Sequence, residues 1–252
     1  DPPDLERGIE ALEKAVELDP TLARAWATLG LYRLDSGDAG GALEALRRAV
    51  ELEPDYYEWR MSLAEGLSAL GRQREAVDAA RRAAELSFSD FSEQLARNNL
   101  AWEICLLRPE DRMLRNEAID NAGKAVLLAP GDPVNLDTQG TAEVLFGEPN
   151  VAEHAFRSAI AHGNDSWGGL GYALALQGKT EQARQALAEF SRLYRAGAMG
   201  AHDAGLAAMA WDELGETQIA RRIFKAAVER WPNHPWADEM REWLEERAEA
   251  GA

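Results

Sequence analysis

The chain has 252 residues, a net charge of −17 at pH 7 and a pI of about 4.7. An acidic body repels phosphate backbones and anionic lipid headgroups, so nucleic acids and anionic membrane surfaces are disfavoured as partners. Basic, neutral or apolar protein partners fit this charge better. No apolar run reaches the length of about 18 residues that a membrane-spanning helix requires, and no signal-peptide pattern opens the sequence.

The cysteine and arginine contents indicate the cellular compartment and the kind of genome that encodes the chain. Cys105 is the one cysteine, which excludes an intramolecular disulfide and a thiolate metal cluster. A cytoplasmic location is therefore expected, and the start at Asp1-Pro2-Pro3 leaves open a removed leader or membrane anchor. Arginine outnumbers lysine 23 to 4, which indicates a GC-rich bacterial genome.

The first predicted element is a helix over residues 4–18. Leu5, Ile9, Leu12 and Val16 recur at helical spacing and form one apolar face. The helix is typical of the second half of a helix pair whose first helix is absent. We expect it to be the weakest part of the array, or else to be covered by a second molecule.

Sequence landmarks then return at a period of 34 residues. They are Pro20 and Pro54, Gly37 and Gly71, and Ala42 and Ala76. This is the length of one helix–turn–helix repeat unit. It predicts a half-repeat over 4–20 and full repeats over 23–56 and 57–90.

The later units are less regular. From Ala76 to Ala118 is 42 residues, eight more than the period, and Pro109 indicates a longer elbow. The intervals Gly147–Gly178 and Gly178–Gly215 are 31 and 37 residues, so a deficit in one unit is offset in the next. The predicted boundaries are 94–132, 133–163, 164–200 and 201–234, followed by a cap helix over 236–249.

Several motifs carry a resemblance to a known family. They are the W-x2-L-G patterns at Trp26-Leu29-Gly30 and Trp167-Leu170-Gly171, the A-x3-F patterns at Ala152-Phe156 and Ala220-Phe224, and the closing prolines Pro130 and Pro232. The chain resembles the tetratricopeptide repeat family over nearly its whole length. The resemblance implies an all-α fold: one right-handed α-solenoid domain over 1–252 with about six units, a leading half-repeat and a C-terminal capping helix.

The resemblance also implies a binding surface. Ligands of this family lie along the concave groove lined by the first helix of each repeat. The corresponding residues are Arg24, Thr28, Glu58, Glu65, Asn98, Asn99, Trp102, Asp137, Thr141, Gly169, Tyr172, His202 and Met209. The family's carboxylate clamp needs Lys, Arg and Asn, and only the asparagines are present beside acidic residues, so a chaperone-tail adaptor is disfavoured.

Two groups within this surface suggest ligand contacts. Asn98 and Asn99 offer amides to a peptide backbone, and Trp102 offers ring area, while local helix-end bonds for the amides and a core place for the ring stay open. Gly168, Gly169 and Gly205 would leave bare backbone, which makes room for a bulky ligand side chain. Tight helix packing explains the same glycines.

No motif points to catalysis. The chain lacks phosphate-loop, nucleophile-elbow and zinc-protease motifs, and its four histidines never stand four residues apart, so no enzyme activity, cofactor or metal is expected. The leading hypothesis is a non-enzymatic protein-interaction module or scaffold that holds a peptide or partner protein in the groove. The alternatives are a regulatory domain from a larger bacterial kinase or secretion component, and a scaffold that self-assembles, with homo-oligomers formed through the N-terminal half-repeat.

Overall fold

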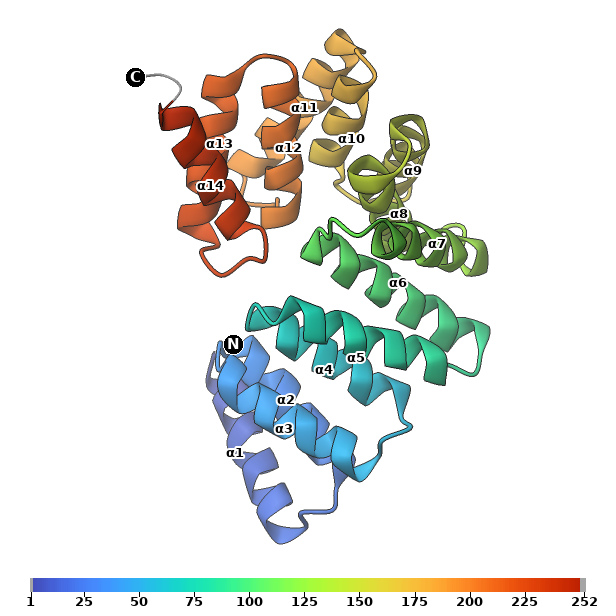
Figure 1. Ribbon diagram of the computed structural model, residues 1–252. Helices are drawn as coiled ribbons and strands as arrows, with labels where there is room; N and C mark the ends of the chain where they lie inside the picture. The colour runs from blue at the N-terminus through green and yellow to red at the C-terminus, as the bar shows by residue number, and fades with distance from the viewer. Residues whose placement is uncertain (1, 250–252) are drawn as a thin grey trace. The chain divides into compact units, whose positions relative to one another are not determined.

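The computed structural model describes residues 2–249, and in that part of the chain fourteen α-helices follow one another without a strand (Figure 1). Contacts divide the chain into two compact units, unit 1 over Asp1–Glu103 and unit 2 over Ile104–Ala252. The sequence predicts a single array over 1–252, of which Asp1 and residues 250–252 lie outside the described part. The division falls inside α6 (Asp90–Leu107), the first helix of the irregular third repeat, which the extra residues lengthen to 18 residues.

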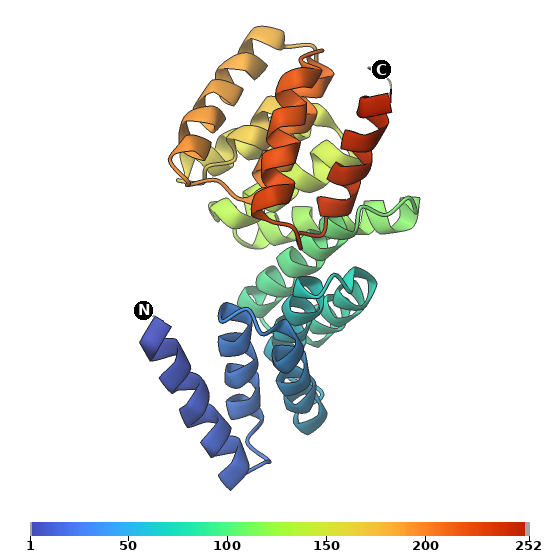
Figure 2. The ribbon, with the colours of Figure 1, turned by 90° about the vertical axis from the view of Figure 1, so that its left-hand side faces the viewer.

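Unit 1 is built of antiparallel helix pairs, and Figure 2 shows its first three helices side by side in blue. Its helices are α1 (Pro2–Leu18), α2 (Ala23–Asp35), α3 (Ala39–Leu52), α4 (Tyr57–Ala69), α5 (Gln73–Leu86) and the larger part of α6. The apolar face of α1 packs on α2 and α3, where Ile9 and Leu12 meet the buried cluster of Val16, Leu29 and Ala45. The leading helix therefore uses its apolar face within its own unit.

Unit 2 continues the pattern over a longer stretch. Its helices are the end of α6, α7 (Arg112–Leu128), α8 (Pro133–Phe146), α9 (Pro149–Ala161), α10 (Trp167–Leu176), α11 (Thr180–Arg195), α12 (Ala201–Glu213), α13 (Thr217–Arg230) and α14 (Ala237–Glu249). The three-residue deficit falls mainly in α10, which has only 10 residues, and α9 has 13. The compensating excess lies in α11, with 16 residues, and in the loop 196–200 after it, as the sequence predicts.

Glycines set the close crossing of the two helices in a pair. An added Cβ at Gly30 would lie 2.5 Å from Leu46 Cγ, and one at Gly171 would lie 2.7 Å from Leu187 Cδ2. Real Cβ atoms do not approach so closely, so any larger residue would push the second helix away. The W-x2-L-G motif therefore marks the point where each second helix crosses the first.

Among residues 2–249, no helix is both long enough and apolar enough to span a membrane.

Candidate functional site

The first helices of the repeats lie next to one another, α2 beside α4 in unit 1 and α8, α10 and α12 in series in unit 2. We call the surface that they form the inner face of each unit. The predicted binding residues on α2, α4 and α6 belong to unit 1, and those on α8, α10 and α12 belong to unit 2. The two groups have different surroundings.

Charged side chains on the inner face of unit 1 reach solvent. Arg24, Glu58 and Glu65 are exposed, and Thr28 is half-buried with its hydroxyl donating to the Arg24 carbonyl at 2.9 Å. Although the Glu65 side chain reaches solvent, neighbouring atoms partly desolvate its carboxyl and raise its pKa, and the charge of Asp35 at the end of α2 raises it further. Two carboxylates on neighbouring first helices therefore repel each other, and a cation between them would relieve that repulsion.

The asparagine pair of α6 carries unused acceptors. Asn98 and Asn99 are half-buried, and the side-chain oxygen of each is shielded from solvent with no hydrogen-bond partner among the described residues. A shielded acceptor without a donor costs roughly 1–3 kcal/mol. Each oxygen would have to turn out toward solvent before a ligand backbone could donate to it, and a bond to the ligand would then remove this cost. Trp102 on the next turn is half-buried and already in contact with its surroundings.

A buried glutamate lies behind this face and has no role in the sequence-based interpretation. Glu103 is only 3% exposed and accepts a hydrogen bond from the Gln73 amide, which also donates to the Glu103 carbonyl at 3.1 Å. Ser68 donates to Gln73 at 3.1 Å. Burial raises the pKa of Glu103 to about 7, although Gln73 and Ser68 oppose the rise. Its place in the apolar run 100–107 is the signal that could have identified it.

On the inner face of unit 2 the predicted residues are buried or half-buried. Thr141 is fully buried, and its hydroxyl lies 3.0 Å from His202 Nε2, which joins α8 to α12. Asp137, Tyr172 and Met209 are half-buried. Burial raises the pKa of Asp137 to about 6 and lowers the pKa of His202 to about 3.

Neighbouring helices fill the space at Gly168 and Gly169, so of the two explanations for these glycines the structure favours tight helix packing over a ligand pocket. A Cβ at Gly169 would lie 2.4 Å from the Phe156 ring, and a Cβ at Gly168 would lie 2.3 Å from the Asp203 carbonyl oxygen. The Asp203 carboxylate accepts hydrogen bonds from both glycine amides at 3.1 Å, so α12 caps the N-terminus of α10. Burial and the nearby Asp137 raise the pKa of Asp203 to about 8, against the effect of these amides.

The chain's own tryptophan occupies the space at Gly205. Trp236, which precedes α14, is 2% exposed, and a Cβ at Gly205 would lie 3.0 Å from its ring. Its indole N–H donates to the Cys105 carbonyl at 3.3 Å. The helical donor for that carbonyl would be residue 109, which is proline and has no N–H. The space beside Gly205 is therefore filled by the chain itself and is not open to a ligand side chain.

Arg108 contacts both Trp236 and Glu239 and so stabilises the segment that joins α13 to α14. Its guanidinium lies 5.1 Å from the centroid of the Trp236 ring, and its Nη1 lies 3.1 Å from Glu239 Oε1. Its φ of +47° places it in the left-handed region, which non-glycine residues adopt at a cost of about 1–2 kcal/mol. The sequence placed Arg108 in a loop and assigned it no role.

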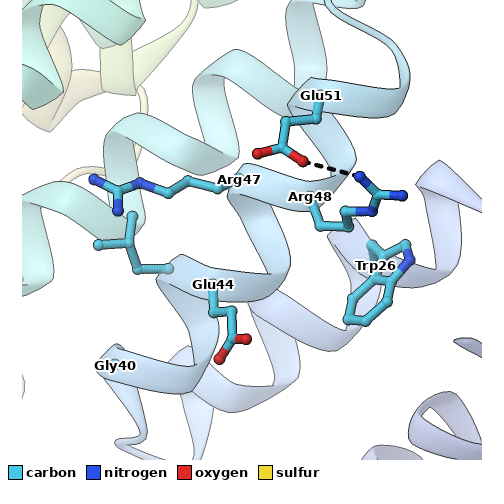
Figure 3. A pocket seen from close by; sticks show the side chains of 7 residues that line it. Trp26, Gly40, Glu44, Arg47, Arg48 and Glu51 are labelled. Carbon is cyan, nitrogen blue, oxygen red and sulfur yellow. Dashed lines mark hydrogen bonds and ion pairs between the residues drawn. The ribbon is translucent and has the colours of Figure 1, made fainter. Parts of the chain in front are cut away.

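Shallow hollows lie on the opposite side, over the second helices. In Figure 3 the side chain of Trp26 from α2 lies beside Arg48 of α3, which pairs with Glu51 at 3.0 Å; this hollow measures about 530 Å³. A similar hollow of about 500 Å³ lies beside Trp167 in unit 2. Each hollow is lined by a tryptophan of the W-x2-L-G motif and by both acidic and basic side chains.

The described residues contain no group of three or more His, Cys, Asp or Glu residues placed to hold a metal ion. Cys105 is fully buried, and burial raises its thiol pKa. A thiol in this state is a poor nucleophile.

Comparison with solved structures reveals several similar folds. A tetratricopeptide repeat protein from Parabacteroides merdae has a TM-score of 0.70 at 17% identity, over 97% of this chain and 93% of that chain. Pseudomonas aeruginosa pilF has a TM-score of 0.55 at 19% identity, over 87% and 96%. YrrB, described as a TPR protein with an unusual peptide-binding site, has a TM-score of 0.51 at 14% identity, over 93% and 99%. At these identities the likeness shows the fold alone.

A search of curated protein sequences finds no match. The family model described as Tetratricopeptide repeat matches residues 27–90 and 138–198, one stretch in each half of the chain. Those stretches contain helix pairs with the glycine crossing and the solenoid stacking described above. The chain belongs to the tetratricopeptide repeat family.

Proposed function

We propose that the chain is a protein-interaction module that binds a basic or neutral peptide segment along the inner face of unit 1, without chemistry of its own. The observation that supports this most is the contrast between the inner faces. Asn98 and Asn99 in unit 1 keep shielded, unpaired acceptors, whereas Trp236 fills part of the face in unit 2. A peptide-binding site is known for YrrB, whose fold is similar.

The chemistry of the unit 1 face indicates the kind of ligand. An extended backbone presents N–H donors, to which the oxygens of Asn98 and Asn99 can bond once these half-buried side chains turn outward. A lysine or arginine of the ligand would lie near Glu65 and Asp35, whose mutual repulsion it would reduce. Trp102 would supply ring area, and contacts of this kind typically lose about 2 kcal/mol or more on truncation.

The proposal is tested by capture from a cell extract with paired charge-reversal variants. Glu58→Lys with Glu65→Lys alters the inner face, and Glu44→Lys with Glu51→Lys makes the same charge change on the outer surface of α3. We expect a defined set of proteins, identified by mass spectrometry, to be lost by the first pair and kept by the second. Loss with the outer pair alone would place the binding surface at the hollow beside Trp26 instead.

Self-assembly through the leading helix also stays a proposal. Leu18 at the end of α1 is 79% exposed, whereas Ile9 and Leu12 pack within the unit. Sedimentation velocity of the chain and of Leu18→Asp distinguishes the cases. A dimer that the substitution abolishes would support self-assembly, and a monomer at all concentrations would exclude it.

A further inference from the structure

We propose that the inner face of unit 2 contains a tryptophan-binding slot for protein segments in which a carboxylate follows a tryptophan by three residues. The slot's resident occupant is the chain's own segment from Trp236 to Glu239. An external segment of the same chemistry would compete with it. This second site is independent of the peptide surface proposed for unit 1.

An acceptor that the helix cannot satisfy makes the slot selective for an indole. Cys105 is fully buried near the end of α6, and Pro109 removes the N–H that would bond its carbonyl. The Trp236 indole N–H supplies the missing donor. A phenylalanine would fill much of the same volume but leave this carbonyl unpaired, which costs roughly 1–3 kcal/mol.

The walls of the slot fit a large flat ring. Gly205 on α12 gives the ring its close approach, since any Cβ there would lie about 3.0 Å from it. The His202 ring has its centroid 4.9 Å from that of Trp236, and the Arg108 guanidinium lies over the indole at 5.1 Å. A cation over an indole face is favourable by about 0.5–2 kcal/mol.

The second recognition element is the carboxylate one helical turn further on. Glu239 lies in the first turn of α14, and Arg108 pairs with it at 3.1 Å while covering Trp236. One arginine therefore contacts both parts of the segment. Its left-handed backbone conformation ends α6 directly after Leu107 and places Arg108 between the two parts of the segment.

An external segment with a tryptophan and a carboxylate three residues later can restore the hydrogen bond to Cys105, the ring contact with Arg108 and the ion pair with Arg108. It does not replace the contacts that Trp243 and Arg247 of α14 make with Asp212.

The resident segment is connected through the loop 231–235, whose Pro232 and Pro235 interrupt the helical chain between α13 and α14. A space of about 50 Å³ between Met209, Phe224 and Trp243 remains unfilled beside the ring. Because the loop 231–235 connects the resident segment to α13, its effective concentration is roughly in the millimolar range. A competing segment must therefore bind more tightly or be present at a similar concentration.

The first experiment empties the slot in the full chain. Trp236→Gly is titrated with indole and with 1-methylindole, which lacks the N–H donor, and binding is followed by calorimetry and by the melting temperature. We expect indole to bind and to raise the melting temperature with concentration, and 1-methylindole to bind about tenfold more weakly. The matched control is Trp26→Gly, because Trp26 also donates to a carbonyl but is only half-buried. Equal binding of indole by both variants, or no binding by either, would overturn the slot.

The second experiment uses a synthetic, dye-labelled peptide of residues 231–249 and fluorescence anisotropy. We expect it to bind Trp236→Gly, to bind about tenfold more weakly when the peptide carries phenylalanine at position 236, and to bind about threefold more weakly when it carries glutamine at 239. If Trp236→Gly does not fold, Trp236→Phe replaces it, because phenylalanine keeps most of the ring volume. The peptide should then bind this variant about tenfold more tightly than it binds the unaltered chain. Equal affinity for the tryptophan and phenylalanine peptides would contradict the proposal.

Discussion

Unit 1 and unit 2 share the same helix pairs and differ in what meets their inner faces. In unit 1 the first helices carry exposed Arg24, Glu58 and Glu65, and the neighbouring asparagines keep unpaired acceptors. In unit 2, Gly168 and Gly205 allow Asp203 and Trp236 of the same chain to approach the backbone. The comparison shows that a few glycines on the first helices decide whether an inner face is filled from within the chain.

An ion pair attaches the terminal helix of each unit, but the amount of buried apolar surface behind the pair differs. Arg33 pairs with Glu13 of α1 at 2.7 Å, and Arg108 pairs with Glu239 of α14 at 3.1 Å. Behind the second pair lies a fully buried tryptophan, whereas α1 contributes only partly buried aliphatic residues beyond Val16. The C-terminal segment should therefore be the more firmly held of the two.

The largest expected effect comes from removing the side chain that fills unit 2. Trp236→Ala should lower the free energy of unfolding of unit 2 by about 3–5 kcal/mol, because it leaves a cavity and an unpaired carbonyl at Cys105. Chemical denaturation followed by hydrogen exchange assigns the loss to each unit. Trp26→Ala, at a half-buried position in unit 1, should cost less. If Trp236→Ala and Trp26→Ala lowered the free energy of unfolding equally, Trp236 would not stabilise unit 2 more than Trp26 stabilises unit 1.

The next effect concerns the cap that α12 provides for α10. Asp203→Ala removes the acceptor of the Gly168 and Gly169 amides and should destabilise unit 2 by about 1–3 kcal/mol. Amide exchange at these two glycines, measured by NMR, should accelerate in the variant. Unchanged exchange there would show that the carboxylate does not cap the helix.

The buried carboxyl of Asp203 also predicts a pH dependence for unit 2. Its folded-state pKa of about 8 lies above the ordinary 3.8, so the folded state keeps a proton that the unfolded state releases. Stability should therefore fall as pH rises from 6.5 to 8. Below 6.5, His202 and His234 act in the opposite direction, because burial lowers their pKa values to about 3 and about 4.

Urea denaturation at pH 6.5 and pH 8 measures this slope, again resolved by hydrogen exchange into the two units. The Asp203→Asn variant has no proton to lose at that position and should show a flatter dependence in unit 2. A slope that the variant retains in full would assign the effect to another group.

The smallest expected effect is that of the exposed ion pairs. Glu13→Gln and Glu239→Gln should each change the free energy of unfolding by about 1 kcal/mol or less, since both glutamates are partly solvated. Differential scanning calorimetry at low and high salt provides the measurement. A much larger loss for Glu239→Gln would mean that Arg108 depends on this pair to cover Trp236.

The sequence predicts the helix pairs well because their signals are local. The 34-residue period, the W-x2-L-G patterns and the glycine crossings at Gly30 and Gly171 all lie within one repeat. The interval arithmetic around Gly178 predicts a deficit in one unit that is offset in the next, whereas the short α10 and the long α11 both lie in the predicted unit 164–200.

The filled face of unit 2 could not be predicted in the same way. Trp236 and Cys105 stand 131 residues apart, and repeat periodicity gives no information on such a pair. Pro109 was the available signal, because it denies the Cys105 carbonyl its helical donor. The bare backbone at Gly205 was explained by a ligand side chain or by tight helix packing, and nothing in the sequence showed that Trp236 of the same chain fills the space.

The most direct test of the account is hydrogen exchange on the chain with and without a captured protein partner. We expect the partner to slow amide exchange in α2, α4 and the first part of α6, and to leave α8, α10, α12 and α14 unchanged. New protection confined to α8, α10 and α12, with faster exchange in α14, would contradict the central claim that the captured partner binds the inner face of unit 1, and would instead assign its binding to the slot that Trp236 fills.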